Sequence, residues 1–104
     1  MPREQFQNLT EPMYYILLAL LRESCGVDIM NSVDRISKGR IKVGPGTLYA
    51  LLGKFEKEAM IRETKVEGRK RSYIITSKGM EILEEESKRL RMLVSDGEFI
   101  LGGK

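Results

Sequence analysis

The sequence of 104 residues contains no histidine, no tryptophan and a single cysteine. Without histidine it lacks the commonest general base of enzymes and the commonest metal ligand. Cys25 alone cannot form a disulfide within the chain, which fits the reducing cytoplasm. The longest apolar run, Met13–Leu21, is about half as long as a membrane span. We therefore expect a cytoplasmic domain with no membrane contact, no metal and no cofactor.

The charged residues are segregated along the chain. The formal net charge of +3 comes from 18 basic and 15 acidic side chains. Residues 1–34 carry two bases and five acids, residues 35–78 carry twelve and four, and residues 79–104 carry four and six. The middle of the chain therefore holds nearly all the positive charge, a pattern that suits a polyanion meeting one face of the molecule.

Apolar residues at helical spacing predict four helices. These helices cover residues 10–23, 27–37, 47–59 and 77–94. We expect Gly26 to end the first helix, Thr76 to cap the last, and Asp96-Gly97 to stop it. Residues from Glu98 onward are expected to fray.

The period of the apolar pattern changes to two after the third helix. Residues 61–67 and 71–75 alternate as strands do, and a turn at residues 67–70 joins them into a hairpin. Ile41-Lys42-Val43 can form a very short strand. Three helices followed by a two-stranded hairpin predict a mainly α (α+β) winged helix-turn-helix.

The first helix has too much apolar surface for one stripe. Tyr14, Tyr15, Leu18 and Ala19 cover much of the face opposite the predicted core stripe. A helix that is apolar nearly all round must be buried on two sides, which in a small domain indicates a second subunit.

The third helix shows a polar and basic face to solvent, made of Thr47, Tyr49, Ala50, Gly53, Lys54 and Lys57. Gly44-Pro45-Gly46 precedes it, and free N–H groups with the positive helix dipole favour a phosphate there, although the same triplet is also an ordinary turn. An interior glycine costs about 1 kcal/mol relative to alanine. An exposed Gly53 therefore indicates that the helix backbone approaches a partner closely.

Three consecutive bases, Arg69-Lys70-Arg71, fall at the hairpin turn and repel one another unless an anion neutralises them. A basic run is commonly a solvated surface, as we expect of the acidic run Glu84-Glu85-Glu86. Beside a basic helix in the order of a winged helix, the basic turn favours nucleic acid, with phosphate contacts that weaken steeply with salt.

Three separated motifs stand in the sequence: Leu9-Thr10-x-x-Met13-Tyr14-Tyr15-Ile16-Leu17, Gly46-Thr47-Leu48-Tyr49-x-x-Leu52, and Gly68-Arg69-Lys70-Arg71-x-Tyr73-x-x-Thr76-x-x-Gly79. In this order they closely resemble the PadR-like family of bacterial and archaeal transcriptional regulators. The resemblance implies a homodimeric winged-helix protein that binds double-stranded DNA. It further implies a repressor that releases its operator when a small effector binds. Two-fold symmetry predicts a palindromic operator.

The resemblance also implies site residues. It puts Thr47, Tyr49, Arg69, Lys70 and Arg71 on DNA, and the basic segment adds Lys38, Arg40, Lys42, Gly46 and Lys54. It makes the C-terminal helix, helped by the first, the dimer interface, where we expect Tyr14, Leu18, Leu83, Leu90, Leu93 and Val94. Residues 1–78 then form the DNA-binding domain, residues 79–96 the dimerisation helix and residues 97–104 a flexible tail.

The sequence departs from the family pattern in three ways. Ala59 stands where the family usually has a glycine at the end of the third helix. A single C-terminal helix places the chain in the short subgroup. Without tryptophan, an effector pocket built on tryptophan stacking is absent; Tyr14, Tyr15, Phe6 and Phe99 can line a smaller one, although core packing suits the two tyrosines better. The effector itself is not indicated.

Two other classes of protein fit the sequence less well. Winged-helix modules for protein–protein contact often lose the basic face, and this chain keeps it. An enzyme is excluded because we find no paired carboxylates, no metal-ligand spacing and no phosphate loop. Cys25 has only Arg22 as a nearby base in sequence, which favours an inert thiol over a redox sensor.

Overall fold

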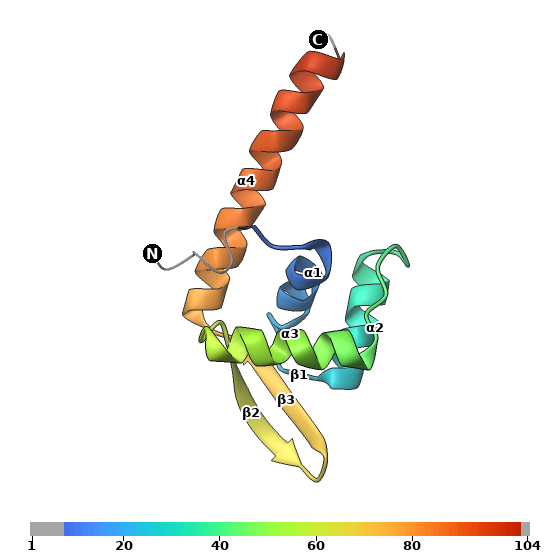
Figure 1. Ribbon diagram of the computed structural model, residues 1–104, viewed down its shortest axis with the longest axis vertical. Coiled ribbons are helices and arrows are strands. Elements are labelled where there is room, and N and C mark those ends of the chain that lie inside the picture. Colours follow the sequence, from blue (N-terminus) through green and yellow to red (C-terminus); the bar gives the residue numbers. More distant parts are fainter. Residues whose placement is uncertain (1–7, 103–104) are drawn as a thin grey trace.

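Four helices and a three-stranded antiparallel sheet make up residues 8–102, the part of the chain that this computed structural model describes (Figure 1). In chain order the elements are α1 (Glu11–Ala19), β1 (Ser24–Cys25), α2 (Gly26–Ile36), α3 (Pro45–Lys57), β2 (Ile61–Glu67), β3 (Lys70–Ile75) and α4 (Ser77–Gly102). Helices α1, α2 and α3 form a body, the β2–β3 hairpin projects from one side of it, and α4 extends away on the other (Figure 1). The predicted order of three helices, hairpin and helix is confirmed.

Helix α1 begins at the predicted cap, Thr10, and ends earlier than expected. The predicted extension to residue 23 is wrong because the chain turns after the C-cap Leu20 and enters the sheet at Ser24–Cys25. The Ile75 N–H donates to the Leu20 carbonyl oxygen at 2.9 Å. Strand β1 then pairs antiparallel with β3, in the sheet order β1-β3-β2. Pairing between segments far apart in the sequence thus overrides the local apolar period.

Gly26 begins α2 and does not end the preceding helix, so that prediction is wrong. A Cβ on Gly26 would collide with the hydroxyl of Tyr49 on α3. A side chain at position 26 would therefore displace the Tyr49 ring from its place against α2.

The segment Ile41-Lys42-Val43 is not a strand in the structure, and the short strand lies instead at β1. The Ile41 N–H donates to the Ser37 hydroxyl at 3.0 Å, which folds the α2–α3 loop back on itself. Lys38 and Gly39 precede it with left-handed φ values of 57° and 80°. Because the loop folds back in this way, it has no extended backbone that could pair with a strand.

Helix α3 ends in a left-handed residue. The Met60 N–H donates to the Phe55 carbonyl at 2.8 Å and the Ala59 N–H to the Glu56 carbonyl at 3.0 Å, which are the two bonds of a Schellman motif. Ala59 has a φ of 61°, a conformation that costs a residue with a Cβ roughly 1–2 kcal/mol. Ala59 therefore occupies a position where glycine would be more stable, because glycine has no Cβ.

The β2–β3 hairpin, which we call the wing, turns at Gly68 with a φ of 64°. Its register shifts between Glu63 and Lys65, so that Thr64 forms a bulge. The Thr64 hydroxyl donates to Glu23 Oε2 at 2.6 Å, which ties the bulge to the turn after α1. Beyond the bulge, each β2 side chain therefore lies on the opposite face of the wing from the one that strict alternation predicts.

Helix α4 starts at its predicted cap and continues through the predicted stop. The Gly79 N–H donates to the Thr76 hydroxyl at 3.1 Å. The helix passes Asp96-Gly97 and ends at Gly102, so the predicted end at residue 94 and the fraying of residues 98–102 are wrong. A helical glycine costs about 1 kcal/mol relative to alanine, which is too little to stop a long helix. Residues 103–104 of the expected tail lie outside the described residues.

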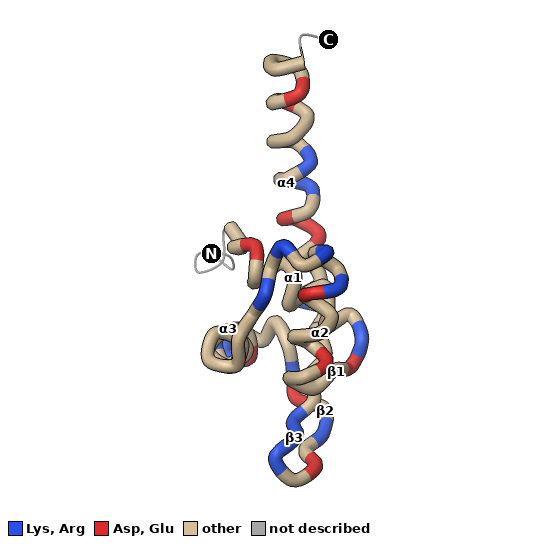
Figure 2. The backbone as a smooth tube through the Cα atoms, turned by 90° about the vertical axis from the view of Figure 1, so that its right-hand side faces the viewer, with Lys and Arg blue, Asp and Glu red and all other residues tan. Residues whose placement is uncertain are grey.

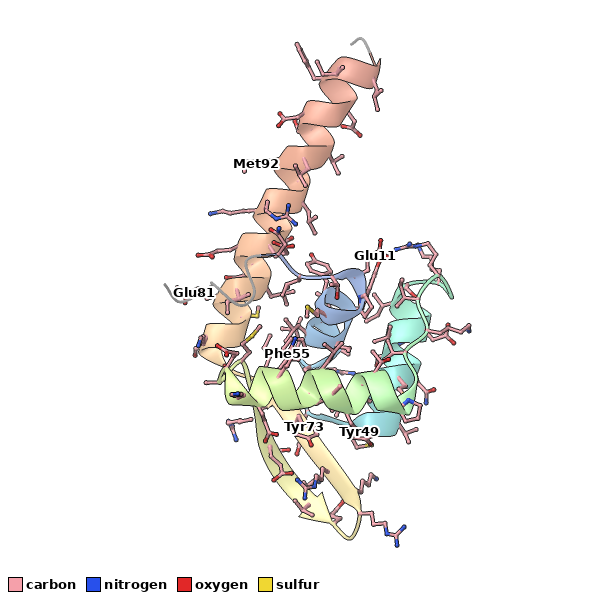
Figure 3. The ribbon with its side chains drawn as sticks, viewed as in Figure 1. Glu11, Tyr49, Phe55, Tyr73, Glu81 and Met92 are labelled. Atoms are coloured by element: carbon pink, nitrogen blue, oxygen red, sulfur yellow. The ribbon has the colours of Figure 1, made fainter. Side chains whose placement is uncertain are left out.

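One core joins the three helices of the body to the wing and to the first half of α4. Phe55 points from α3 into it (Figure 3). The core side chains are Ile16, Leu17, Ala19, Leu20, Ile29, Val33, Val43, Leu48, Leu52, Phe55, Met60, Ile61, Tyr73, Ile82 and Leu83. Burial of the α3 stripe at Leu48, Leu52 and Phe55 leaves the opposite face of this helix to solvent.

Glu86 is fully buried, so the expectation of a solvated Glu84-Glu85-Glu86 face is wrong at that position. Its carboxylate accepts hydrogen bonds from the Leu9 N–H at 2.9 Å and from the Arg89 guanidinium at 2.9 and 2.7 Å. The bond to Glu86 raises the pKa of Arg89 above its ordinary value. A buried carboxylate requires partners of this kind, and here they tie the segment before α1 to α4.

Candidate nucleic-acid interface

Helix α3 presents the polar face that the sequence predicts. Thr47, Ala50, Gly53, Lys54 and Lys57 are exposed, and Tyr49 is 51% exposed. Apart from the two neighbouring residues and the backbone of α3 itself, no atom of the described residues lies within 4 Å of where a Cβ on Gly53 would stand. The space over the middle of α3 is therefore open, which allows the helix backbone to approach a groove closely.

The N-terminus of α3 is free to bind an anion. Its N-cap residue is Gly44, so the helix has no side-chain capping hydrogen bond, and the first turn of the helix contains no acidic residue. The first N–H groups of a helix have no partner within the helix and carry the positive end of its dipole. Gly46, predicted to contact DNA, is exposed in this turn with open space around it.

The wing carries its bases at the tip. Arg69, Lys70 and Arg71 are all exposed there, and Lys and Arg positions line both strands in Figure 2. Tyr73 packs at the wing's base, between wing and α3, where burial first and then Glu56 and Glu63 raise its pKa. The structure thus anchors the wing at one end and leaves its cationic tip free.

Three of the residues predicted to contact DNA form ion pairs within the chain. Two of them, Arg40 and Lys42, lie in the loop between α2 and α3. Arg40 binds Glu11 at 3.4 Å and the Tyr15 hydroxyl at 3.0 Å, and the bond to Tyr15 is the first cause of its raised pKa. Lys42 pairs with Asp34 at 3.2 Å. Arg40 therefore braces the α2–α3 loop against α1, a role that sequence reasoning did not assign.

On the wing, Arg71 pairs with Glu63 at 3.2 Å across the two strands. The remaining predicted cations, Lys38, Lys54, Arg69 and Lys70, make no ion pair with any described residue. All four are exposed. The charge on these four side chains is therefore not neutralised by an ion pair within residues 8–102.

Two residues that bear on the candidate interface were not predicted: the exposed Lys65, and the buried Gly26 beneath Tyr49. The bulge at Thr64 puts Lys65 opposite Ser72, on the same face of the wing as Lys70, whereas simple alternation puts it beside Glu63. Gly26 underlies Tyr49 and so sets where that ring lies. The local sequence indicates neither role, because both roles arise from contacts between segments that are far apart in the chain.

The predicted dimer residues separate into two groups. Leu83 is 4% exposed and belongs to the core of its own chain, so it offers no surface to a second one. Tyr14, Leu18 and Leu90 are half-buried. Leu93 and Val94 are 53% and 58% exposed on the part of α4 that extends beyond the body.

A groove of about 980 Å³ lies between α1 and α4 and is lined by Tyr14, Ser87, Lys88, Leu90, Arg91, Met92, Val94, Ser95 and Glu98. Of the aromatic residues considered for a small pocket, Tyr14, Tyr15 and Phe99 lie in the described part of the chain, and among these three only Tyr14 lines the groove. Phe6 lies outside the described residues, and Phe99 is 71% exposed further along α4.

Residues 8–102 lack two features that would indicate another kind of site. No helix there is long and apolar enough to cross a membrane. The same residues contain no group of three or more His, Cys, Asp and Glu side chains placed to hold a metal ion.

Comparison with known proteins identifies the family. A model described as the transcriptional regulator PadR-like family matches residues 16–85. The chain belongs to the PadR-like family of transcriptional regulators. The family consists of regulators and not of enzymes, which confirms the class predicted from the sequence.

Solved PadR-like structures share the fold over most of the chain. A PadR-like transcriptional regulator from Bacillus cereus is 26% identical, with a TM-score of 0.70 over 90% of this chain and 92% of that one. A PadR family regulator from Eggerthella lenta is 20% identical, with a TM-score of 0.71 over 85% and 75% of the two chains. The mainly helical winged-helix fold with one long C-terminal helix is thus confirmed.

The curated relatives are longer proteins. Transcriptional regulator YqjI of Escherichia coli is 26% identical over 88% of this chain, which spans 44% of that protein. An uncharacterized 37.1 kDa protein in transposon TN4556 of Streptomyces fradiae is 32% identical over 65% of this chain and 19% of its own length. The PadR-like chain described here therefore spans less than half of the curated relatives that it matches.

Proposed function

We propose that this PadR-like chain is a sequence-specific DNA-binding regulator whose α3 enters the major groove while the wing reaches the neighbouring phosphates. The observation that carries the proposal is a set of exposed cations, Lys38, Lys54, Arg69 and Lys70, on α3, the wing and the loop before α3, none of which forms an ion pair with another residue of the described range 8–102. Contacts from such cations to phosphate supply most of the affinity for DNA. The exposed Thr47 and Tyr49 stand on α3 where base edges are read.

The ion pairs divide the predicted DNA residues by role. Arg40, Lys42 and Arg71 already hold carboxylates and chiefly position the loop and the wing. Gly46 leaves the N-terminus of α3 open to a phosphate. Lys38, Lys54, Arg69 and Lys70 then gain most from an anion, because no carboxylate among residues 8–102 competes for them.

We also propose that the protein acts as a homodimer on a palindromic operator. Residues 1–78 form the DNA-binding part, and α4 with α1 forms the dimer contact through Tyr14, Leu18, Leu90, Leu93 and Val94. Exposed apolar side chains on α4 support this contact. A two-fold axis places the two α3 helices about 34 Å apart, one turn of DNA.

Repression relieved by a small effector completes the proposed function. PadR-like membership supports regulation, and the groove between α1 and α4 is lined by Tyr14, Leu90 and Val94, three residues of the proposed dimer contact, so that a ligand there would act on that contact. A thermal-shift screen of phenolic acids, drugs and metabolites checks this part: a ligand that raises the melting temperature must also lower the affinity for operator DNA.

Fluorescence anisotropy with DNA from upstream of the protein's own gene tests DNA binding. We expect the wild type to bind this DNA at least about a hundredfold more tightly than a scrambled duplex. Tyr49→Ala and Thr47→Ala must reduce that ratio, and Arg69→Ala/Lys70→Ala must weaken binding to both duplexes alike.

Asp96→Asn, on α4, serves as the control variant and leaves both affinities unchanged. If the wild type binds no DNA at about 100 mM salt, where cation–phosphate contacts are still strong, or if all of these variants bind as it does, the proposal is wrong. A winged-helix module for protein–protein contact then becomes the better account.

A further inference from the structure

Helix α1 lies between the groove and the segment that leads into α3. It packs against α4 on one side and against α2 on the other (Figure 1). The groove of about 980 Å³ opens between α1 and α4. The α2–α3 loop, residues 37–44, connects α2 to the helix that is proposed to read DNA. A contact that crosses α1 therefore joins the groove to the DNA-binding side of the molecule.

Two adjacent tyrosines of α1 make such a contact. Tyr14 lines the groove, whereas the Tyr15 hydroxyl accepts a hydrogen bond from Arg40 Nη2 at 3.0 Å. The two rings lie edge to face, with centroids 6.1 Å apart and planes at 86°. Both side chains are half-buried and pack against the core. Because a packed interior has little free volume, a displacement of the Tyr14 ring must displace Tyr15.

Arg40 joins α1 to the α2–α3 loop. Its Nη2 atom binds the Tyr15 hydroxyl, and its Nη1 atom binds Glu11 Oε1 at 3.4 Å. Figure 3 shows Glu11 on the side of α1 that faces this loop. Within residues 8–102, these are the side-chain hydrogen bonds between α1 and the loop. The position of the loop relative to α1 therefore depends on Arg40.

The Tyr15 hydroxyl is the more important of the two partners. The side chains of Arg40 and Glu11 are 59% and 61% exposed, and an ion pair so exposed contributes little. Tyr15 is half-buried, and a hydrogen bond to a charged group is stronger than one between neutral groups. The bond to Tyr15 is also the first cause of the raised pKa of Arg40. Loss of this one hydroxyl should therefore release the loop from α1.

The α2–α3 loop is compact, so a change at Arg40 extends to both of its ends. The Ser37 hydroxyl accepts from the Ile41 N–H at 3.0 Å, and the Gly39 N–H donates to the Asp34 carbonyl at 2.8 Å. The loop ends at Gly44, which is the N-cap of α3. A shift of Arg40 is therefore not absorbed within the loop and alters the positions of Lys38 and of the first turn of α3.

We propose that Tyr14, Tyr15 and Arg40 couple the groove to the DNA-binding surface, with Tyr15 as a positioning residue for the α2–α3 loop. A molecule in the groove displaces Tyr14 and with it the Tyr15 hydroxyl, which releases Arg40. The loop then leaves the position in which Lys38 and α3 bind DNA. This inference rests on the DNA binding and the effector groove of the proposed function, and adds the residues that connect the two sites.

Fluorescence anisotropy with the upstream DNA tests the role of the hydroxyl. Tyr15→Phe keeps the ring beside Tyr14 and removes only the bond to Arg40, so it should weaken binding at least about fivefold. Glu11→Gln removes the exposed ion pair and should change the affinity less than about threefold. Asp34→Asn breaks the Lys42 pair in the same loop and should not weaken binding. A Tyr15→Phe chain that binds as tightly as the wild type would overturn the proposal.

A tryptophan in the groove tests the coupling itself. The chain has no tryptophan, so Ser87→Trp, at a half-buried position of α4 that lines the groove, reports on the groove alone. Coupling between two sites is reciprocal, so saturating upstream DNA should shift the emission maximum of this variant. Asp34→Asn in the same background should keep the shift.

Two further changes in the Ser87→Trp background should abolish the shift, at DNA concentrations that still saturate the protein. Tyr15→Phe removes the hydroxyl that binds Arg40. Arg40→Lys keeps the charge but not the planar fork that holds two partners. A purely structural effect of Tyr15 lowers the affinity but leaves the shift of the saturated complex in place, so the shift identifies coupling.

The outcomes separate this inference from the proposed function. If Ser87→Trp binds the DNA without a shift, or if the shift persists with Tyr15→Phe, the coupling is overturned while the DNA-binding proposal stands. If Ser87→Trp itself abolishes DNA binding, Ser95→Trp, at an exposed position of the same groove, takes its place in the measurement. A wild type that binds no DNA overturns both the proposed function and the coupling.

Discussion

At the scale of single residues, the structure shows at three positions what the presence or absence of a Cβ atom means. Ala59 adopts the left-handed conformation at the end of α3, Gly79 lies against the Met60 carbonyl, and Gly53 faces open space. The sequence suggests the first through its departure from the family pattern, and the third through its place on the exposed face of the third helix. The close contact at Gly79 depends on the neighbours that a Cβ would meet, which no local pattern contains.

Ala59→Gly should stabilise the protein by about 1 kcal/mol, because the left-handed cap no longer holds a Cβ. For a domain of this size the melting temperature should rise by roughly 4–8 °C. Differential scanning calorimetry at fixed protein concentration measures it. A lower melting temperature would mean that the Schellman geometry does not hold.

Gly79→Ala should destabilise the protein by about 1–3 kcal/mol, because the new Cβ would overlap the Met60 carbonyl and crowd Ile75. The clash lies where α4, β3 and the end of α3 meet, so none of them can yield separately. Urea denaturation followed by circular dichroism measures the decrease. Unchanged stability would contradict the packing described at this junction.

Gly53→Ala should have opposite effects on folding and on DNA binding. Its Cβ meets nothing within 4 Å in the free chain, so the helix should gain up to about 1 kcal/mol. If α3 lies deep in the groove, the same methyl group must separate it from DNA and lower the affinity. A variant that is both more stable and unimpaired in anisotropy titrations would show that α3 does not approach DNA at this point.

At the scale of elements, the apolar period predicts α2, α3 and the wing to within about two residues, since their buried faces are set by local spacing. It fails where distant segments decide. The helix stops at Ala19 and the chain turns, because β3 pairs with Ser24–Cys25 and donates a hydrogen bond to the Leu20 carbonyl; Thr64, at the bulge in β2, bonds to Glu23 in the turn after α1. The end of α4 is missed because Gly97 costs a helix of 26 residues too little to stop it.

Val94→Asp/Leu101→Asp should convert the dimer to a monomer without unfolding the body, because both side chains are largely exposed in the single chain. The operator affinity should then fall at least about tenfold, because two half-sites no longer bind one linked pair of domains. Sedimentation, circular dichroism and anisotropy together check this. A dimer that persists would place the subunit contact elsewhere than on α4.

At the scale of the whole molecule, the charge map along the sequence predicts where the candidate interface lies but not which cations serve it. Lys38, Lys54, Arg69 and Lys70 stay unpaired within the described residues, whereas Arg40, Lys42 and Arg71 bind carboxylates. Each of these pairs joins residues at least eight positions apart. Only the assembled fold brings them together, so the sequence alone overestimates the charge available for DNA.

The salt dependence of DNA affinity tests the central claim most directly. The slope of log K against log salt becomes shallower by about 0.9 for every phosphate that the protein no longer binds. Arg69→Ala/Lys70→Ala should therefore flatten the slope by about 2 to 4 in a dimer with two wings. Asp96→Asn should leave the slope as it is in the wild type. A double variant with an unchanged slope would contradict the claim that the cationic tip of the wing binds DNA.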